Sequence, residues 1–430
     1  EAECCRVRRH RARERHRLMS FAFPEGFLWG VAGSGHQTEG HNVLGDTWFA
    51  EHVEPTIFRE FSGPACDSYS RWAEDVELAA SLGLNAYRFS VEWCRIEPEP
   101  GVFDSAELDH YEAIVDRCGE RGLAPLVTMN HFTSPRWFAE RAGWLNPDAP
   151  ERFGRYCQVV AERFGDRISS AVTLNEPNLA RLLTWLHLPD FVRELERATL
   201  EACSSKAGVE RFRLSNVMLP EEMDEIAEGM TLGHLAAKSA LKSVVPALPV
   251  GLSIAIVDDQ VIGDDTSLRD RKRREVYDRW LDLASEDDFI GVQNYERVWY
   301  DAQGEVPPEL GRATNSMGTG IYPESLAEAV RYAHERSGVP VLVTEHGLSH
   351  LDDQLRAGLI PDAIAGLAEV CAEGVPVLGY VHWSFLDNWR WVWGYQNQLG
   401  LVAVDRTTFE RTPKPSARVL GAIAQANALE

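Results

Sequence analysis

Glu345 closes an apolar stretch that reads Pro-Val-Leu-Val-Thr-Glu-His-Gly from Pro340 to Gly347. The unbroken apolar run at 341–343 is typical of a strand buried on both faces, as in a parallel sheet wrapped by helices. In such folds the reacting groups lie at the C-terminal ends of the strands. A carboxylate at this point is either a catalytic group or a structural anion paired with an arginine, and this stretch alone is compatible with both.

A second carboxylate, Glu176, ends another β-type run. Two carboxyl groups about 5 Å apart can hydrolyse a glycosidic bond, because one protonates the leaving oxygen while the other attacks the anomeric carbon or activates a water. If the fold brings Arg88 and Tyr295 to the same place, they keep Glu345 ionised, and its charge raises the pKa of Glu176. The pattern predicts Glu345 as nucleophile and Glu176 as acid, then base.

The elements that would position these residues alternate along the chain. Eight β-type runs cover residues 27–33, 86–91, 124–130, 169–176, 250–257, 289–295, 341–345 and 377–385. Helical patterns cover residues 69–82, 108–120, 149–164, 225–244, 271–283, 323–337 and 355–372. Eightfold alternation predicts an α/β fold, a single (β/α)8 TIM barrel with elaborated loops at its C-terminal face. A doubly wound open sheet is the alternative, but no Gly-x-Gly-x-x-Gly motif follows a strand.

If the barrel is correct, polar side chains at the strand ends converge on one mouth. They are Gln37, Glu39, Arg88, Asn130, His131, Asn175, Glu176, Tyr295 and Glu345, together with Trp383. Each has a structural explanation when taken alone, for example a core imidazole or an ion-pair partner. Because so many of them fall at strand ends, a shared binding site is the better interpretation.

The composition allows a substantial folded core and argues against nucleic acid as a partner. The 430 residues are 44% hydrophobic, and a formal net charge of -23 leaves little basic surface for phosphate contacts. The sequence contains no apolar run of about 18 residues, so we predict no membrane span.

Residues 1–18 differ from the rest because they are rich in arginine. They contain no apolar stretch long enough for a signal-peptide core, and Met19 could be the true start. We interpret this segment as a disordered basic extension or a cloning artefact, with a functional basic arm as the alternative. Residues 19–430 are then expected to form a single domain.

Eight cysteines are scattered along the chain without a Cys-x-x-Cys pair, which predicts free thiols in a reducing cytoplasm. His346 and His350 have a spacing that suits a helical metal site. They follow a strand end, however, and lack the glutamate of a zincin motif, so we predict no metal. The oligomeric state stays open, with a homo-oligomer as one alternative.

Several motifs occur in the order of a known family. They are Phe-Leu-Trp-Gly from Phe27, Gln-Thr-Glu-Gly from Gln37, Ala-Tyr-Arg-Phe-Ser from Ala86, Thr-Leu-Asn-Glu-Pro-Asn from Thr173, Val-Thr-Glu-His-Gly from Val343 and Trp-Ser-Phe-Leu-Asp-Asn from Trp383. From about Phe23 to Ala417 the chain resembles the family 1 glycoside hydrolases, the β-glucosidase family. The resemblance implies a (β/α)8 barrel, hydrolysis of a β-linked glycoside with retained configuration, and no metal or cofactor.

The same resemblance implies roles for individual residues. It places the acid/base at Glu176 and the nucleophile at Glu345. Four residues would hydrogen-bond the sugar before the cleaved bond, and they are Gln37, His131, Asn175 and Trp391. Trp383 would stack beneath the sugar ring.

Some positions depart from the family's pattern. His346, Gln293 and Phe132 replace an asparagine, an asparagine and a tryptophan, and these changes look tolerable. The larger departure is Arg390, which stands where the family has a glutamate that holds O4 and O6 of the sugar. Arg390 therefore favours a uronic acid or an O6-extended sugar, unless it turns away to pair with Glu39 or Asp387 and leaves a neutral sugar.

Two further functions have sequence signatures of their own. A phospho-glycosidase of the same family would need a serine followed by a Lys-x-Tyr phosphate cradle, and the matching region reads Tyr-Gln-Asn-Gln-Leu from Tyr395. A carbohydrate-binding pseudoenzyme without catalysis would be signalled by loss of either glutamate, and both are present.

The segment 179–229 is polar and lacks clear family motifs. We expect an elaborated loop over the aglycone side of the site, with a plain surface insertion as the alternative. Three aromatic residues, Trp185, Phe191 and Phe212, are candidates to line it.

Overall fold

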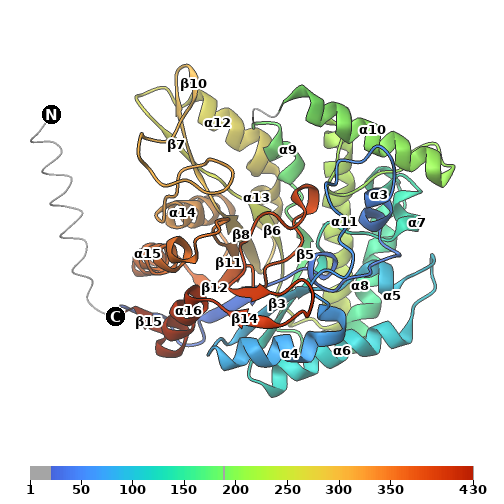
Figure 1. Ribbon diagram of the computed structural model, residues 1–430, viewed down its shortest axis with the longest axis horizontal. Helices are drawn as coiled ribbons and strands as arrows, with labels where there is room; N and C mark the ends of the chain where they lie inside the picture. The colour runs from blue at the N-terminus through green and yellow to red at the C-terminus, as the bar shows by residue number, and fades with distance from the viewer. Residues whose placement is uncertain (1–20, 187–188, 430) are drawn as a thin grey trace, which may run out of the picture.

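The computed structural model describes residues 21–186 and 189–429, and its centre is a closed barrel of parallel strands (Figure 1). The strands, in barrel order, are β11 (Val341–His346), β12 (Val377–Trp383), β2 (Leu28–Ala32), β3 (Ala86–Ser90), β4 (Ala124–Asn130), β5 (Ser170–Asn175), β6 (Val250–Ala255) and β8 (Phe289–Asn294). The predicted barrel is confirmed. Because the sheet closes on itself, the doubly wound alternative is wrong.

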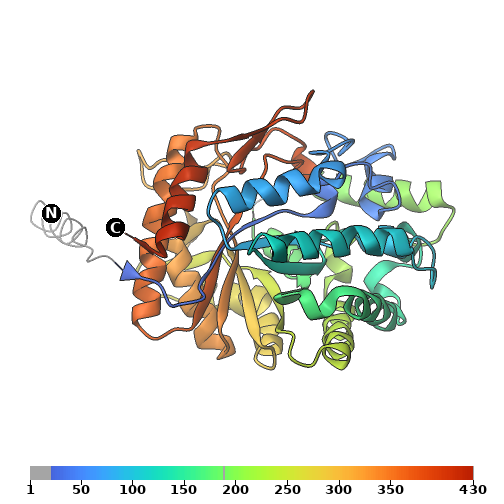
Figure 2. The ribbon, with the colours of Figure 1, turned by 90° about the horizontal axis from the view of Figure 1, so that it is seen from below.

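Amphipathic helices cover the outside of the barrel. They are α4 (Ser68–Ser81), α6 (Ser105–Glu120), α8 (Ala149–Phe164), α11 (Met223–Val244), α14 (Ser325–Ser337), α15 (Asp353–Ala372) and α16 (Pro415–Ala426). Figure 1 shows α14, α15 and α16 on one side of the strands and α8 and α11 on the opposite side. Helices α4 and α6, at the bottom of Figure 1, face the viewer in Figure 2. The helix expected at 271–283 is instead α12 (Ser267–Arg273) and α13 (Arg279–Ala284), joined by a π-helical turn, Arg274–Asp278.

The strands are apolar on both faces because each face meets a different core. Seven strands contribute apolar side chains to one cluster inside the barrel, and these are Ala32, Ala86, Leu126, Val172, Phe289, Leu342 and Val381. Alternate residues such as Val341 and Val343 point outward and pack in the larger core under the helices. This two-sided burial explains the continuous apolar runs in the sequence.

One irregularity in β11 re-aims its last residues. Val343 pairs with Val292 of β8, but the next pair in register is Glu345 with Gln293, so β11 contains one extra residue. Strict alternation would place Glu345 on the same face as Val343, against the helices. This β-bulge instead turns the carboxylate toward the barrel interior.

A similar shift occurs in β5 next to β6. Val172 pairs with Gly251 and Asn175 pairs with Ser253, so three steps along β5 match two along β6. Val172 lies in the barrel interior, whereas Leu174 packs in the outer core. The shift returns Asn175 to the interior, and two strands thereby present polar side chains to the same space.

Further elements elaborate the connections between the barrel strands. Strands β7 (Asp258–Val261), β9 (Arg297–Asp301) and β10 (Gly304–Val306) form a separate three-stranded sheet, and smaller pairs join β1 (Phe21–Ala22) to β15 (Ala428–Leu429) and β13 (Val402–Val404) to β14 (Arg411–Pro413). Figure 1 shows β7 and β10 beside α12. The strands of this outer sheet were not predicted: β7 (Asp-Asp-Gln-Val) and β10 (Gly-Glu-Val) are short and polar, although β9 contains the strand-favouring run at 298–300.

The segment 179–229 is mostly helical rather than a loop. It contains α9 (Leu179–Leu183), α10 (Asp190–Ala207) and the start of α11. Phe212 is fully buried in a second hydrophobic cluster with Phe49 and Trp389, so it cannot line a ligand surface. The expectation of an elaborated loop lined by Phe212 was wrong, because apolar residues of α10 pack on this cluster.

Four further sequence predictions concern the basic segment, the cysteines, membrane spans and the location in the cell. The basic segment 1–18 lies outside the described residues. Among the described cysteines, Cys66, Cys94, Cys118, Cys157, Cys203 and Cys371 are unpaired. Within the described ranges, no helix is long and apolar enough to cross a membrane. The cytoplasmic location stays a prediction.

Candidate active site

Glu345 lies at the C-terminal end of β11 and receives hydrogen bonds from three side chains. Arg88 Nη1 and Gln293 Nε2 donate to its Oε1, at 2.6 Å and 3.0 Å, and the Tyr295 hydroxyl donates to Oε2 at 2.6 Å. The Glu345 side chain is only 5% exposed. A buried carboxylate with this number of donors is strongly oriented, and its charge is compensated by Arg88.

Arg88, on β3, connects the nucleophile candidate to the neighbouring strands. Its Nη2 donates to Asn175 Oδ1 at 2.6 Å, and its Nε donates to Thr128 Oγ1 at 3.2 Å. Gln293 Nε2 also donates to Asn175 Oδ1, at 2.7 Å. The fork of the guanidinium thus fixes Glu345 and Asn175 relative to each other.

Glu176 follows the end of β5 and is held by its backbone rather than by its side chain. Its amide donates to the Ser253 carbonyl at 2.7 Å, and its φ of 45° is left-handed. Among the described residues, no hydrogen bond reaches its carboxyl group, which is partly buried. Residues other than glycine rarely adopt the left-handed conformation, and those that do often lie in active sites.

The two carboxyl groups differ in their acidity. Burial, and secondly the nearby charge of Glu345, raise the pKa of Glu176 to about 8, against the positive charges of Arg88 and Arg390. Burial also raises the pKa of Glu345, but the charge of Arg88 and hydrogen bonds from Tyr295 and Arg88 oppose that rise. Glu345 therefore ionises first, and Glu176 keeps its proton at neutral pH.

His131 presents a free donor to the same space. Asn175 Oδ1 is taken by Arg88 and Gln293, so the amide nitrogen faces His131 and donates to its Nε2 at 3.3 Å. Burial and the charges of Arg88 and Arg390 lower the pKa of His131 well below its usual value, so the ring is neutral. Its proton is then on Nδ1, which is buried without a partner among the described residues.

Aromatic rings flank His131 in nearly parallel planes. The Trp383 ring lies 5.3 Å from the His131 ring at an interplanar angle of 13°, and the Trp391 ring lies 6.3 Å away at 9°. Trp383 ends β12, and Trp391 begins the short 3-10 helix Trp391–Trp393. Flat apolar faces of this kind are suited to the C–H faces of a sugar ring.

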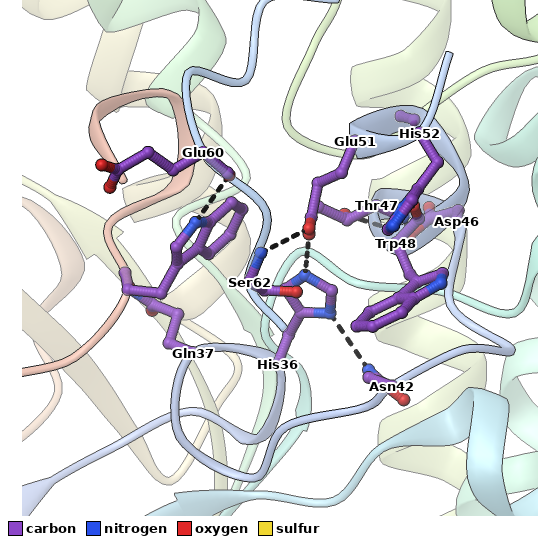
Figure 3. Close-up of polar contacts among 12 residues, drawn as sticks. His36, Gln37, Asn42, Asp46, Thr47, Trp48, Glu51, His52, Glu60 and Ser62 are labelled. Carbon is purple, nitrogen blue, oxygen red and sulfur yellow. Dashed lines mark hydrogen bonds and ion pairs between the residues drawn. The ribbon is translucent and has the colours of Figure 1, made fainter. Parts of the chain in front are cut away.

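Gln37 is buried close to the Trp389–Trp391 loop. Its Nε2 donates to the Trp389 carbonyl at 2.7 Å, and the Ser34 hydroxyl donates to its Oε1 at 2.8 Å. The neighbouring His36 lies between Glu51 and Asn42 (Figure 3), with a 2.8 Å contact from Nε2 to Glu51 Oε1. The clamped His36 fixes the turn that carries Gln37.

The Glu51 carboxylate is held from a second side. The Ser62 amide donates to its Oε2 at 2.6 Å (Figure 3). The His36 ring also lies parallel to that of Trp391, at 5.8 Å and 7°. The layer behind Gln37 is therefore a buried, hydrogen-bonded support rather than part of the open mouth.

Arg390 lies between Trp389 and Trp391, and within the described chain it forms no ion pair with either acid expected from the sequence. Its charge acts on Glu176 and Glu345. Glu39 is instead paired with Arg95 at 2.8 Å, and Asp387 is paired with Lys414 at 2.6 Å. The ion pair of Arg390 with Glu39 or Asp387 is therefore not present among the described residues. The neutral sugar that this alternative implied stays a prediction.

Most predicted site residues come together, and two do not. The Glu39 carboxylate accepts from Tyr111 as well as from Arg95, and Asn130 donates to the Thr133 carbonyl at 3.0 Å. Gln293, omitted from the predicted site, contacts Glu345 directly. The sequence could have indicated Gln293, because it is a polar residue in a mostly apolar strand and stands two residues before Tyr295. Residues two apart in a strand point to the same face.

Another departure from the family's pattern, His346, faces away from the carboxyl pair. Its Nδ1 lies 2.9 Å from the Tyr380 hydroxyl, and its ring is buried. The residue after the nucleophile candidate therefore has a supporting position in the core.

Replacing Arg88 by lysine should lower kcat by about 100-fold, because an ammonium group cannot hold both Glu345 and Asn175 in the fork geometry. Arg95→Lys is the matched control, since Arg95 is a largely buried arginine paired with an acid outside the site. Steady-state kinetics and thermal unfolding of both variants provide the comparison. Equal losses of kcat would show that Arg88 acts only through stability.

The mouth of this barrel holds one carboxyl group that three donors orient and a second whose pKa is raised to about 8. Such a pair, at the C-terminal ends of barrel strands, is the arrangement that glycoside hydrolysis requires. The model of the family described as "Glycosyl hydrolase family 1" matches residues 19–203 and 282–429. The chain belongs to this family and is a β-glycosidase that hydrolyses O-glycosyl bonds.

Similar proteins cover nearly the whole chain. Beta-glucosidase A of Thermotoga maritima is 28% identical over 95% of this chain and 99% of the relative, and thermostable beta-glucosidase B of Thermobispora bispora is 30% identical over 92% and 89%. The crystal structure of beta-glycosidase BGL167 superposes with a TM-score of 0.89 at 43% identity, covering 94% of this chain and 97% of that one. The Thermotoga maritima beta-glucosidase complexed with deoxynojirimycin has a TM-score of 0.81 at 27% identity, covering 95% and 100%.

Proposed function

We propose that the protein is a retaining β-glycosidase of the β-glucosidase type that works by double displacement. The observation that carries the proposal is the contrast between the two carboxyl groups. Glu345 receives donors on both oxygens, whereas the unbonded Glu176 has a pKa raised to about 8. One group is prepared to attack, and the other is prepared to donate a proton.

In the first step, Glu345 attacks the anomeric carbon and forms a glycosyl ester, while Glu176 gives its proton to the leaving oxygen. Loss of the carboxylate charge on Glu345 then removes the second of the two causes that raise the pKa of Glu176, and burial remains. In the second step, the ionised Glu176 takes a proton from water, the water oxygen attacks the anomeric carbon, and Glu345 leaves as a carboxylate. Attack from opposite faces in two steps retains the configuration.

The sugar itself would satisfy polar atoms that the described residues leave without partners. Buried atoms of this kind at the mouth include His131 Nδ1 and Gln293 Oε1, a donor and an acceptor. Buried polar groups are normally hydrogen-bonded, so these two are suited to sugar hydroxyls. Asn175 and Gln37 supply further amide hydrogens, and Trp383 and Trp391 supply flat apolar surfaces.

The relatives support a glucose-like sugar in this site. Both relatives described above are named beta-glucosidase, and one of the related structures contains deoxynojirimycin. We extend this preference to the present chain as part of the proposal.

The proposal is tested by trapping the covalent intermediate. A 2-deoxy-2-fluoro β-glycoside with a good leaving group should form a long-lived ester, because the fluorine destabilises the transition states of both steps. Intact mass spectrometry and peptide mapping should find one sugar on the peptide that contains Glu345. An adduct on another residue would contradict the assignment, and Glu345→Gln provides the control that should form none.

A further inference from the structure

The guanidinium of Arg390 lies in the catalytic mouth without a partner. Both Nε and Nη1 are buried and make no hydrogen bond to the described residues, and only the backbone amide is bonded, to the Gly394 carbonyl at 2.7 Å. Arg390 as a whole is half-buried, and buried N–H groups without an acceptor are costly, because they have lost water and gained no hydrogen bond in exchange. Substrate is the natural source of the missing acceptor.

Acidic groups near this loop have other partners. Besides Glu39 and Asp387, the Glu51 carboxylate contacts His36, and Glu60 Oε2 accepts from the Tyr395 amide at 2.7 Å. Within the described part of the chain, Arg390 also forms no ion pair with Glu176 or Glu345. Among the described residues, the Arg390 guanidinium therefore has no direct ion-pair partner, although the charge of Glu345 acts on it from nearby.

The charges of the mouth add up to a positive site. Arg88 and Glu345 cancel, Glu176 carries a proton at neutral pH, and His131 is neutral, so the charge of Arg390 is left over. This local excess stands out in a chain whose formal net charge is -23. A guanidinium without a direct ion-pair partner in a partly desolvated pocket favours an anion, and its planar fork fits a carboxylate or a phosphate.

The loop that carries Arg390 is well supported. Trp389 is fully buried in the second hydrophobic cluster, where side chains of α10 and Phe212 surround it, and its indole donates to the Glu60 carbonyl at 3.0 Å. Trp391 packs on the same cluster and on His36. The backbone at Arg390 is thus held on both sides along the chain, as a specificity residue requires.

We infer that the enzyme acts on β-glycosides whose glycone carries an anionic group, which Arg390 binds. This inference rests on the proposed function, and it narrows the substrate class of the same site. A sugar whose anomeric carbon lies between Glu176 and Glu345 would present one of its ring substituents to the Arg390 fork. A uronic acid carboxylate and a sugar phosphate share this chemistry.

The test is a panel of four 4-nitrophenyl β-glycosides: glucoside, glucuronide, 6-phosphoglucoside and xyloside, which lacks the C6 group. We expect wild type to favour one of the two anionic substrates, and which one distinguishes carboxylate from phosphate. Arg390→Gln should lower the kcat/KM ratio of that substrate to the glucoside by about 10-fold to 100-fold. Arg390→Lys, which keeps the charge but loses the fork, should lie between.

Arg59→Gln is the matched control. Arg59 is an exposed arginine whose guanidinium lies 4.7 Å from the centre of the Trp393 ring, so this substitution removes one positive charge near the same loop. Its ratio should stay at the wild-type value. Inhibition of the wild type by glucuronate and by glucose 6-phosphate, compared with glucose, gives a readout that needs no variant. Tighter inhibition by one anion is expected.

A wild type that prefers the neutral glucoside, with the same ratio in Arg390→Gln and no tighter inhibition by either anion, would overturn the inference while leaving the proposed function intact. Hydrolysis of none of the four substrates would instead count against the proposed function, and the inference would fail with it.

Discussion

Replacing Glu345 by glycine should lower kcat for an aryl β-glycoside by at least about 10⁴-fold, because the variant has no group to form the covalent intermediate. Azide added to this variant should restore part of the activity, since the space left by the side chain admits a small anionic nucleophile. Azide displaces the leaving group in a single step, which inverts the configuration at the anomeric carbon, so the product should be the α-glycosyl azide. Chromogenic kinetics and NMR of the product provide the measurement.

The control for this experiment is Glu345→Gln, which fills the same space without a nucleophile. It should be equally inactive, and azide should not rescue it. Activity close to wild type in Glu345→Gly without azide would contradict the assignment. Rescue that yields a β-glycosyl azide would mean that Glu345 has the other role.

Glu176→Gln should change the response to the leaving group and to pH. With an unactivated aglycone, kcat/KM should fall by about 10²-fold to 10⁴-fold, because no acid protonates the departing oxygen. With 2,4-dinitrophenolate, which leaves without a proton, the loss in kcat/KM should be small. The second step also needs the base, so kcat should fall for both substrates.

The pH profile reports the same group. Glu176 must carry its proton in the free enzyme, and its pKa is raised to about 8, so wild-type kcat/KM should fall as the pH rises through this value. Glu176→Gln should lose this basic limb for the dinitrophenyl substrate. A basic limb that is unchanged in the variant would mean that another residue supplies the acid.

The barrel could be predicted because eight apolar runs alternate with helical patterns. This alternation can be recognised without knowing in which direction any individual side chain points. Helix boundaries such as 149–164 agree with α8 (Ala149–Phe164). The direction of the catalytic side chains was not visible in the same way. Strict alternation fails at the bulges in β5 and β11, which only the pairing with β6 and β8 defines.

The remaining differences have tertiary causes. Helix α10 packs on a hydrophobic cluster with Phe49 and Trp389, which are distant in sequence. The segment 179–229 is polar overall, so its sequence alone did not predict this helix. Likewise, the partners of Glu39 and Asp387 could not be deduced from the local sequence. Their pairing with Arg95 and Lys414 leaves Arg390 in the mouth.

The most direct test of the account is the anomeric configuration of the first product, observed by proton NMR during rapid hydrolysis of the preferred 4-nitrophenyl β-glycoside. Double displacement through Glu345 predicts that the β anomer of the free sugar appears first and then mutarotates to the equilibrium mixture. Initial appearance of the α anomer would show a single displacement by water and would contradict the assignment of Glu345 as the nucleophile.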